Sequence, residues 1–275
     1  FVVLVVGSGC RECAIVKKLI EDTKKNINLE IISFTTTNNP YLVKNCHIWN
    51  VDNYDLIQLE NFLNNYKYLQ GKLDIAIIGP EAPLENGYAD LLQQNNIPCL
   101  GPTKFYAEIE TSKIFTRDFL QKNNLGHLSP KYEIICCEEI SNLSDNQSKY
   151  DYVNKKLEKF DKIVVKKNGL CGGKGVTVQD IDFSNKNEFV IKQIEQMNIN
   201  SKFLIEEKLE GEEFSLMSIT DGTNHCIHFP PIQDYKRLND GDKGPNTGGM
   251  GCVIDKNNNL EFLNEDDLEK CKLIN

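Results

Sequence analysis

A glycine-rich segment with lysines on both sides is the part of the sequence best suited to chemistry on phosphate. A short apolar run leads to Lys166 and Lys167, and four glycines and a further lysine follow: Gly169, Gly172, Gly173, Lys174 and Gly175. Glycine permits positive φ and close backbone approach, so N–H groups can point at phosphate oxygens, and lysines add charge. No Gly-Lys-Ser/Thr opens a helix here, which excludes a Walker loop. The pattern predicts a strand–loop–strand flap that covers ATP, and the alternative is a glycine hairpin without a ligand.

A second segment combines charged side chains with turn residues. Asp234, Lys236 and Arg237 precede a run from 244 to 251 that contains Asn246, Thr247 and several glycines. Clustered turn residues beside basic side chains are typical of a pocket built from backbone rather than of a packed element. Such a pocket could hold an amino acid carboxylate near the γ-phosphate of ATP. The alternative is an Ω-loop whose glycines are structural.

The acidic segment 206–213 runs from the end of one predicted strand through Gly211. Its backbone groups could pair with an adenine edge, and Glu206, Glu207 or Glu213 could accept ribose hydroxyls. A solvated acidic turn explains the segment equally well when it is taken alone.

Two turns near the N-terminus follow apolar runs. Residues 7–12 place amide N–H groups, Gly9, Arg11 and Glu12 between a strand and a helix, where a phosphate would bind. Residues 79–84 contain Glu81 and Pro83 and close another strand. Only two of the three glycines of a dinucleotide fingerprint are present, so the two turns together favour a sugar-phosphate site instead.

Cysteine chemistry is a weaker possibility. Cys10 and Cys13 form a CxxC at a strand–helix junction, which allows a redox role, but the usual aromatic and Pro neighbours are missing. No second Cys/His pair has zinc-ligand spacing, and His225 and His228 would point to opposite faces of a strand. With no secretion signal and no regular spacing, the ten cysteines are expected to be reduced thiols of a cytoplasmic protein.

The first hundred residues alternate strand and helix patterns. Strands are expected at 1–6, 29–34, 74–80 and 97–100, with helices at 14–21, 56–66 and 87–94. This alternation predicts a doubly wound parallel sheet with ligands beyond the carboxyl ends of its strands. We therefore expect an α/β domain at 1–103 that binds substrate.

From residue 104 the pattern changes, and a second domain, 104–275, is expected. It begins with one long helix at 104–123 and contains a lid subdomain at about 130–197. In the lid, residues 138–155 read as a surface excursion that leads into a helix, and strands at 162–166 and 175–178 flank the glycine loop. Strands at 203–207, 212–220 and 225–229 are expected as an antiparallel meander, with a turn at Asp221-Gly222. The sequence ends partway into a helix.

Composition limits the partners. The net charge is −9, basic and acidic residues are interspersed, and no apolar run could span a bilayer. We expect no nucleic acid and no membrane as partner, which leaves small molecules. The first residue is Phe rather than Met, so we expect a longer natural chain.

Taken together, the motifs resemble the phosphoribosylamine–glycine ligase family of ATP-grasp enzymes. The segments that carry the resemblance are GSGCREC, GPEAPLENGYAD, GPTKFYAEIETSK, KKNGLCGGKGV, EEKLEGEEFS and QDYKRLNDGDKGPNTGGMG, in the family's order. The last is specific to this ligase, whereas the glycine flap alone indicates only ATP-grasp. The resemblance covers essentially the whole chain.

The resemblance implies that ATP, glycine and 5-phosphoribosylamine react through an acyl phosphate to give glycinamide ribonucleotide in purine synthesis. Lys113, Lys166 and the 169–175 flap would hold the phosphates, and Glu206, Glu207 and Glu213 the adenine and ribose. The residues expected to face the phosphoribosylamine are Gly9, Arg11, Glu12, Glu81 and Pro83. Those expected to line the glycine and transfer region are Asp234, Lys236, Arg237, Asn246 and Thr247. The catalytic set would be Lys166, Asp234, Arg237 and Asn246.

Departures from the family pattern accompany the likeness. Cys13 and Tyr235 stand where the family has His, and Asn168 stands where Asp is common. The family's ligands for Mg²⁺ or Mn²⁺ lie in a later segment, so we expect none within this chain and expect this segment alone to be inactive. Fusion to other purine-pathway domains is possible. The remaining alternatives are a remnant that binds ATP or a sugar phosphate without turnover, and an ATP-grasp ligase for another carboxylate.

Overall fold

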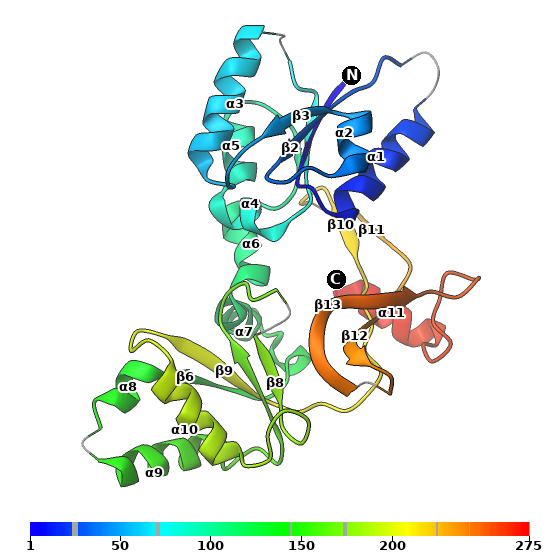
Figure 1. Ribbon diagram of the computed structural model, residues 1–275. Coiled ribbons are helices and arrows are strands. Elements are labelled where there is room, and N and C mark those ends of the chain that lie inside the picture. The colour runs from blue at the N-terminus through cyan, green and yellow to red at the C-terminus, as the bar shows by residue number, and fades with distance from the viewer. Residues whose placement is uncertain are drawn as a thin grey trace. The chain divides into compact units, whose positions relative to one another are not determined.

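The computed structural model describes residues 1–23, 27–69, 72–143, 145–172, 175–223, 225–241 and 243–274, without the side chains of 67–69. The chain forms two compact units, Phe1–Gly126 and His127–Asn275, each of which is described by itself (Figure 1). No helix among the described residues is both long and apolar enough to cross a membrane.

The first unit is a doubly wound parallel sheet, as predicted. Its strands are β1 (Val2–Val6), β2 (Glu30–Thr35), β3 (His47–Asn50), β4 (Ile75–Ile78) and β5 (Cys99–Leu100), in the order β3-β2-β1-β4-β5. All neighbouring pairs are parallel. The helices are α1 (Cys10–Asp22), α2 (Pro40–Asn45), α3 (Leu56–Leu69), α4 (Glu81–Asn86) and α5 (Tyr88–Gln94). The short α2 and β3 were not expected.

Strand β1 explains why helices cover both faces of this sheet. Its residues are apolar throughout, so alternate side chains bury on opposite faces. Val3 and Val5 pack with α1 and α2, around Val16 and Leu42. Leu4 and Val6 pack into a larger core with α3 and α5, whose contributions include Leu59, Phe62, Tyr88 and Leu92.

The predicted single helix at 104–123 is wrong, because Ser112 divides it. Helices α6 (Lys104–Thr111) and α7 (Lys113–Lys122) meet at this residue, whose backbone is extended (φ −132°, ψ 105°). The Ser112 hydroxyl accepts a hydrogen bond from the Phe115 N–H. Serine is a strong N-cap, and this preference outweighs the continuous apolar spacing on either side. A short 3-10 turn, η1 (Gly126–Leu128), lies near the end of the unit.

The second unit begins with an antiparallel sheet of order β6-β9-β7-β8. Its strands are β6 (Tyr132–Cys136), β7 (Ile163–Lys167), β8 (Val176–Val178) and β9 (Lys202–Glu207). Helices α8 (Cys137–Ser141), α9 (Asn146–Leu157) and α10 (Lys186–Gln196) share a core with one face of this sheet, around Val165, Phe203 and Ile205. The surface excursion expected within 138–155 is wrong, since Ile140 and Val153 are buried in that core, whereas the helix expected to follow it is confirmed as α9. Strand β6 was not expected.

The predicted meander is wrong in its first strand, and its second strand, expected at 212–220, forms only at 218–220. β9 pairs with β6 and β7, because its apolar residues pack under the helices. β10 (Ser218–Thr220) and β11 (Cys226–His228) pair only with each other in the described sheets, and Asp221-Gly222 follows β10 as expected. β12 (Gln233–Asn239) and β13 (Lys243–Val253) form a separate hairpin, and α11 (Glu265–Ile274) is the last described helix.

The cysteines provide a chemical test of the first unit. Burial raises the pKa of Cys99 to about 12, and burial together with the nearby Cys13 raises the pKa of Cys46 to about 11. Because the thiolate is the nucleophile, both groups stay protonated and unreactive at pH 8. We expect iodoacetamide at pH 8 to modify the exposed Cys10, Cys226 and Cys252 first. Mass spectrometry of the native protein measures this, and rapid labelling of Cys46 or Cys99 would contradict the packing described.

Candidate functional site

The carboxyl ends of β1 and β4 lie side by side at the point where the strand order reverses. Val6 pairs with Ile78, and the Gly79 N–H donates to the Val6 carbonyl at 3.1 Å. From β1 the chain continues to β2 and β3 on one side, whereas β4 and β5 lie on the other. Ligands of open α/β sheets bind outside such a switch point. The two predicted turns, after β1 and after β4, therefore share one edge.

Arg11 joins these two turns. Its guanidinium donates to the Gly79 carbonyl and lies 3.2 Å from a carboxylate oxygen of Glu81. Both side chains are more than two-fifths exposed, and Gly9 is exposed beside them. Arg11 lies in the first turn of α1, whose free N–H groups also favour anions, so this end of the helix could attract a phosphate.

Glu12 and Pro83 are buried. The Glu12 side chain is 3% exposed, and it accepts a hydrogen bond from the Gly9 N–H. It also fills the space beside two glycines, since a Cβ on Gly79 would collide with Glu12 Oε1 and one on Gly7 would lie 2.7 Å from its Cδ. Gly7 in addition has φ 119°. Glu12 thus shapes the turn from inside, and Pro83 packs within α4.

Thr37 and Asn39 were missed from sequence. They follow β2 at the same sheet edge, where the Thr37 hydroxyl lies 2.7 Å from that of Ser8 and the Asn39 amide donates to the Ser8 carbonyl at 2.9 Å. The signal was the polar run TTTNN directly before Pro40, which marks a strand end followed by a helix start.

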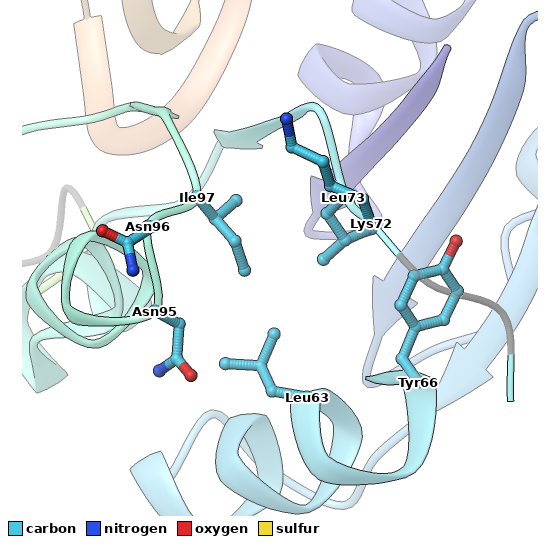
Figure 2. A pocket seen from close by; sticks show the side chains of 7 residues that line it. All are labelled: Leu63, Tyr66, Lys72, Leu73, Asn95, Asn96 and Ile97. Carbon is cyan, nitrogen blue, oxygen red and sulfur yellow. The ribbon is translucent and has the colours of Figure 1, made fainter. Parts of the chain in front are cut away.

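A cavity of about 220 Å³ lies elsewhere in this unit. It is lined by Leu63, Tyr66, Lys72, Leu73, Asn95, Asn96 and Ile97. Figure 2 shows the apolar side chains pointing inward, with the polar ones at the rim. Leu73 and Ile97 precede β4 and β5, so the cavity is at the amino ends of the strands, away from the candidate site.

The flap hairpin consists of β7, β8 and the loop 168–175. Lys167 N–H donates to the Gly175 carbonyl at 2.8 Å, which closes the base of the loop. Gly169 and Gly172 have φ of 93° and 55°, with nothing within 4 Å of a Cβ at either position, so their conformation rather than crowding requires glycine. At Gly175 a Cβ would lie 2.6 Å from that of Cys171. The predicted residues Gly173 and Lys174 lie outside the described residues.

Lys166 and Glu206 form a charge pair beneath this loop. Lys166 Nζ lies 2.5 Å from Glu206 Oε2, and the two side chains are 27% and 2% exposed. Alternation along β7 and β9 places both on the face opposite the helices, since Val165 and Ile205 point into the core. An ammonium in this position could also attract a second anion, such as a phosphate oxygen.

The other acidic residues have separate partners. Glu207 accepts from the Lys131 N–H at 2.8 Å, and Glu213 pairs with Lys236. Burial lowers the pKa of Lys236, but its pairs with Glu213 and Asp234 outweigh this and hold that pKa above the usual value. Lys113 begins α7 in the first unit, after its N-cap Ser112, whereas the other residues predicted for ATP lie in the second.

We call β12 and β13 the substrate hairpin, because five of the predicted residues lie on it. Arg237 has Asn246 as its pairing partner, lies between two register shifts, and donates to the Gly244 carbonyl at 2.9 Å. The Thr247 hydroxyl donates to the Lys236 carbonyl at 2.9 Å. Asp234 Oδ1 is buried and has no hydrogen-bond partner among the described residues, while Oδ2 lies 3.6 Å from Lys236 Nζ. The expected loop pocket is therefore a bulged hairpin with an unpaired acceptor.

Two family models match the chain. The "Phosphoribosylglycinamide synthetase, N domain" matches residues 1–110, and the "Phosphoribosylglycinamide synthetase, ATP-grasp (A) domain" matches residues 111–273. A phosphoribosylamine–glycine ligase of Methanocella arvoryzae is 36% identical over 266 residues, which cover 96% of this chain and 56% of that protein. A bifunctional purine biosynthetic protein of Dictyostelium discoideum is 34% identical over 94% of this chain and 30% of its own length.

Solved structures of ATP-dependent ligases have a similar fold. The crystal structure of a phosphoribosylamine–glycine ligase from Thermotoga maritima aligns with a TM-score of 0.72 and 24% identity. The alignment covers all of this chain and 59% of that one. A D-alanine–D-alanine ligase from Bacillus anthracis aligns less closely, with a TM-score of 0.53 over 92% of this chain. The present chain thus spans a little over half the length of the ligases it matches.

Proposed function

The chain belongs to the phosphoribosylglycinamide synthetase family, and from that membership we propose that it forms the substrate and flap portion of a phosphoribosylamine–glycine ligase. The reaction joins glycine to 5-phosphoribosylamine with ATP, giving glycinamide ribonucleotide, ADP and phosphate. The observation that carries the proposal is the Lys166–Glu206 pair at the base of the flap hairpin, in one unit with the substrate hairpin. It supports phosphate and amino acid binding by one domain.

The chemistry needs positioning and neutralisation of charge rather than a protein nucleophile. A carboxylate oxygen of glycine attacks the γ-phosphorus and ADP leaves, which gives an acyl phosphate. The amine of phosphoribosylamine then attacks the acyl carbon and phosphate leaves. In the second unit Lys166 neutralises phosphate oxygens and Glu206 orients Lys166, and in the first unit Arg11 with the N-terminus of α1 holds the ribose phosphate. Asp234 Oδ1 accepts from the ammonium of glycine.

ATP use implies a divalent metal, Mg²⁺ or Mn²⁺, which when bound would neutralise part of the phosphate charge. Within the described ranges no three His, Cys, Asp or Glu side chains lie together as a metal site requires. The described residues therefore do not fit the metal by themselves. We further propose a cytoplasmic setting and, by likeness to the bifunctional relative, a natural chain fused to other purine-synthesis domains.

The test is turnover by a longer protein that contains this chain. We expect ADP release to require both glycine and phosphoribosylamine, with glycinamide ribonucleotide detected by mass spectrometry. ATP hydrolysis supported by a different carboxylate would indicate a ligase for another acid. Binding of ATP without turnover under any acid and amine would indicate a remnant that has lost activity.

A further inference from the structure

Asp182 is not among the predicted site residues, but its carboxylate contacts both the flap hairpin and the substrate hairpin. It follows β8, the second strand of the flap hairpin, in a tight turn where Asp182 N–H donates to the Val178 carbonyl at 2.8 Å. In return, Asp182 Oδ2 accepts from the Val178 N–H at 2.7 Å. β8 is the edge of its sheet in the described chain, with β7 as its one neighbour. The carboxylate therefore satisfies a backbone donor that the edge leaves unpaired.

The other oxygen of the same carboxylate faces the substrate hairpin. Asp182 Oδ1 lies 3.6 Å from Nη1 of Arg237, whose side chain is only 7% exposed. The same Nη1 donates a hydrogen bond to the carbonyl of Gly244 on β13, the other strand of the hairpin. Because a guanidinium is rigid and planar, fixing one of its nitrogens sets the direction of its remaining N–H groups.

We propose that Asp182 is a positioning residue that joins the edge of the flap hairpin to Arg237 and so couples the ATP and glycine sites. This inference rests on the proposed function for the identity of the two ligands. Asp182 itself touches neither ligand. It acts by orienting Arg237 toward the carboxylate to be phosphorylated while holding the strand that carries the flap.

The test uses full-length protein and three variants. Asp182→Asn keeps an acceptor for Val178 but removes the charge that faces Arg237, so we expect the KM for glycine to rise roughly tenfold with little change in the KM for ATP. Asp182→Ala also frees the β8 edge, so the KM for ATP should rise as well. The matched control is Asp180→Asn, since Asp180 is exposed and its carboxylate pairs with Lys162 at 2.7 Å rather than with Arg237. We expect wild-type constants for it.

Hydrogen exchange gives a readout that does not need activity. In Asp182→Ala without substrates we expect faster amide exchange both at 176–178 and at 233–239, because the contact joins the two segments. If exchange rises in only one segment, or if Asp182→Asn binds glycine like the wild type, Asp182 is not a coupling residue. A wild-type protein without glycine-dependent turnover would refute the proposed function, whereas the exchange result would still decide the role of Asp182.

Discussion

Replacing Lys166 with methionine is expected to lower kcat/KM for ATP by about 30- to 1000-fold, which corresponds to about 2–4 kcal/mol of transition-state stabilisation. Methionine keeps the apolar stem of the side chain but removes the ammonium next to Glu206. In the variant no ammonium at the base of the flap neutralises the negative charge on the phosphate oxygens. The carboxylate of Glu206 is then unneutralised and repels the nucleotide. Both KM and kcat should worsen. Steady-state kinetics on a full-length protein measure the effect.

The control is the adjacent residue. Lys167 is exposed and alternates to the other face of β7, so Lys167→Met should retain wild-type kinetics for ATP. The double variant Lys166→Met with Glu206→Gln separates folding from binding, because it also removes the buried negative charge. We expect it to recover thermal stability without recovering ATP affinity. Equal losses in the Lys166 and Lys167 variants would contradict the placement of the triphosphate.

The first unit could be predicted from sequence because its pattern is local. Continuous apolar runs such as 1–6 and 75–78 identify strands buried on both faces, and the helices between them leave only a parallel sheet. Because β1 and β4 are parallel neighbours in this sheet, the turns that follow them lie at the same edge. The burial of Glu12 does not follow, because it depends on the space left by Gly7 and Gly79, which are distant from each other in sequence.

The second unit shows where sequence patterns fail. β9 has the same apolar character as a meander strand, but its partners are β6 and β7, and no local signal specifies a pairing with a strand so far away in sequence. The glycines of 244–251 suggested a loop, yet a strand with register shifts forms there because positive φ at Gly244 allows bulges. Asp182 was invisible for a related reason: its two partners, Val178 and Arg237, come together only in the folded unit.

The unpaired carboxylate oxygen of Asp234 leads to the second large prediction. A buried acceptor without a donor is costly, and a site that binds a cation can tolerate that cost because the ligand supplies the donor. The ammonium of glycine is such a donor. We expect Asp234→Asn to raise the KM for glycine by about 10- to 150-fold, the equivalent of one charge-assisted hydrogen bond of about 1.5–3 kcal/mol. The KM for ATP should stay at the wild-type value.

The same reasoning predicts opposite effects on binding and stability. Without glycine, Asp234→Asn removes a partly exposed carboxylate whose Oδ1 has no donor among the described residues. Its Oδ2 lies 3.6 Å from Lys236, which also pairs with Glu213, so the Tm should stay unchanged or rise. Asp240→Asn is the matched control, since Asp240 lies exposed in the turn of the same hairpin and should alter neither quantity. Calorimetry with and without glycine measures both effects. If glycine stabilises the Asp234→Asn variant as much as the wild type, the ammonium binds elsewhere and Asp234 Oδ1 is only a packing defect.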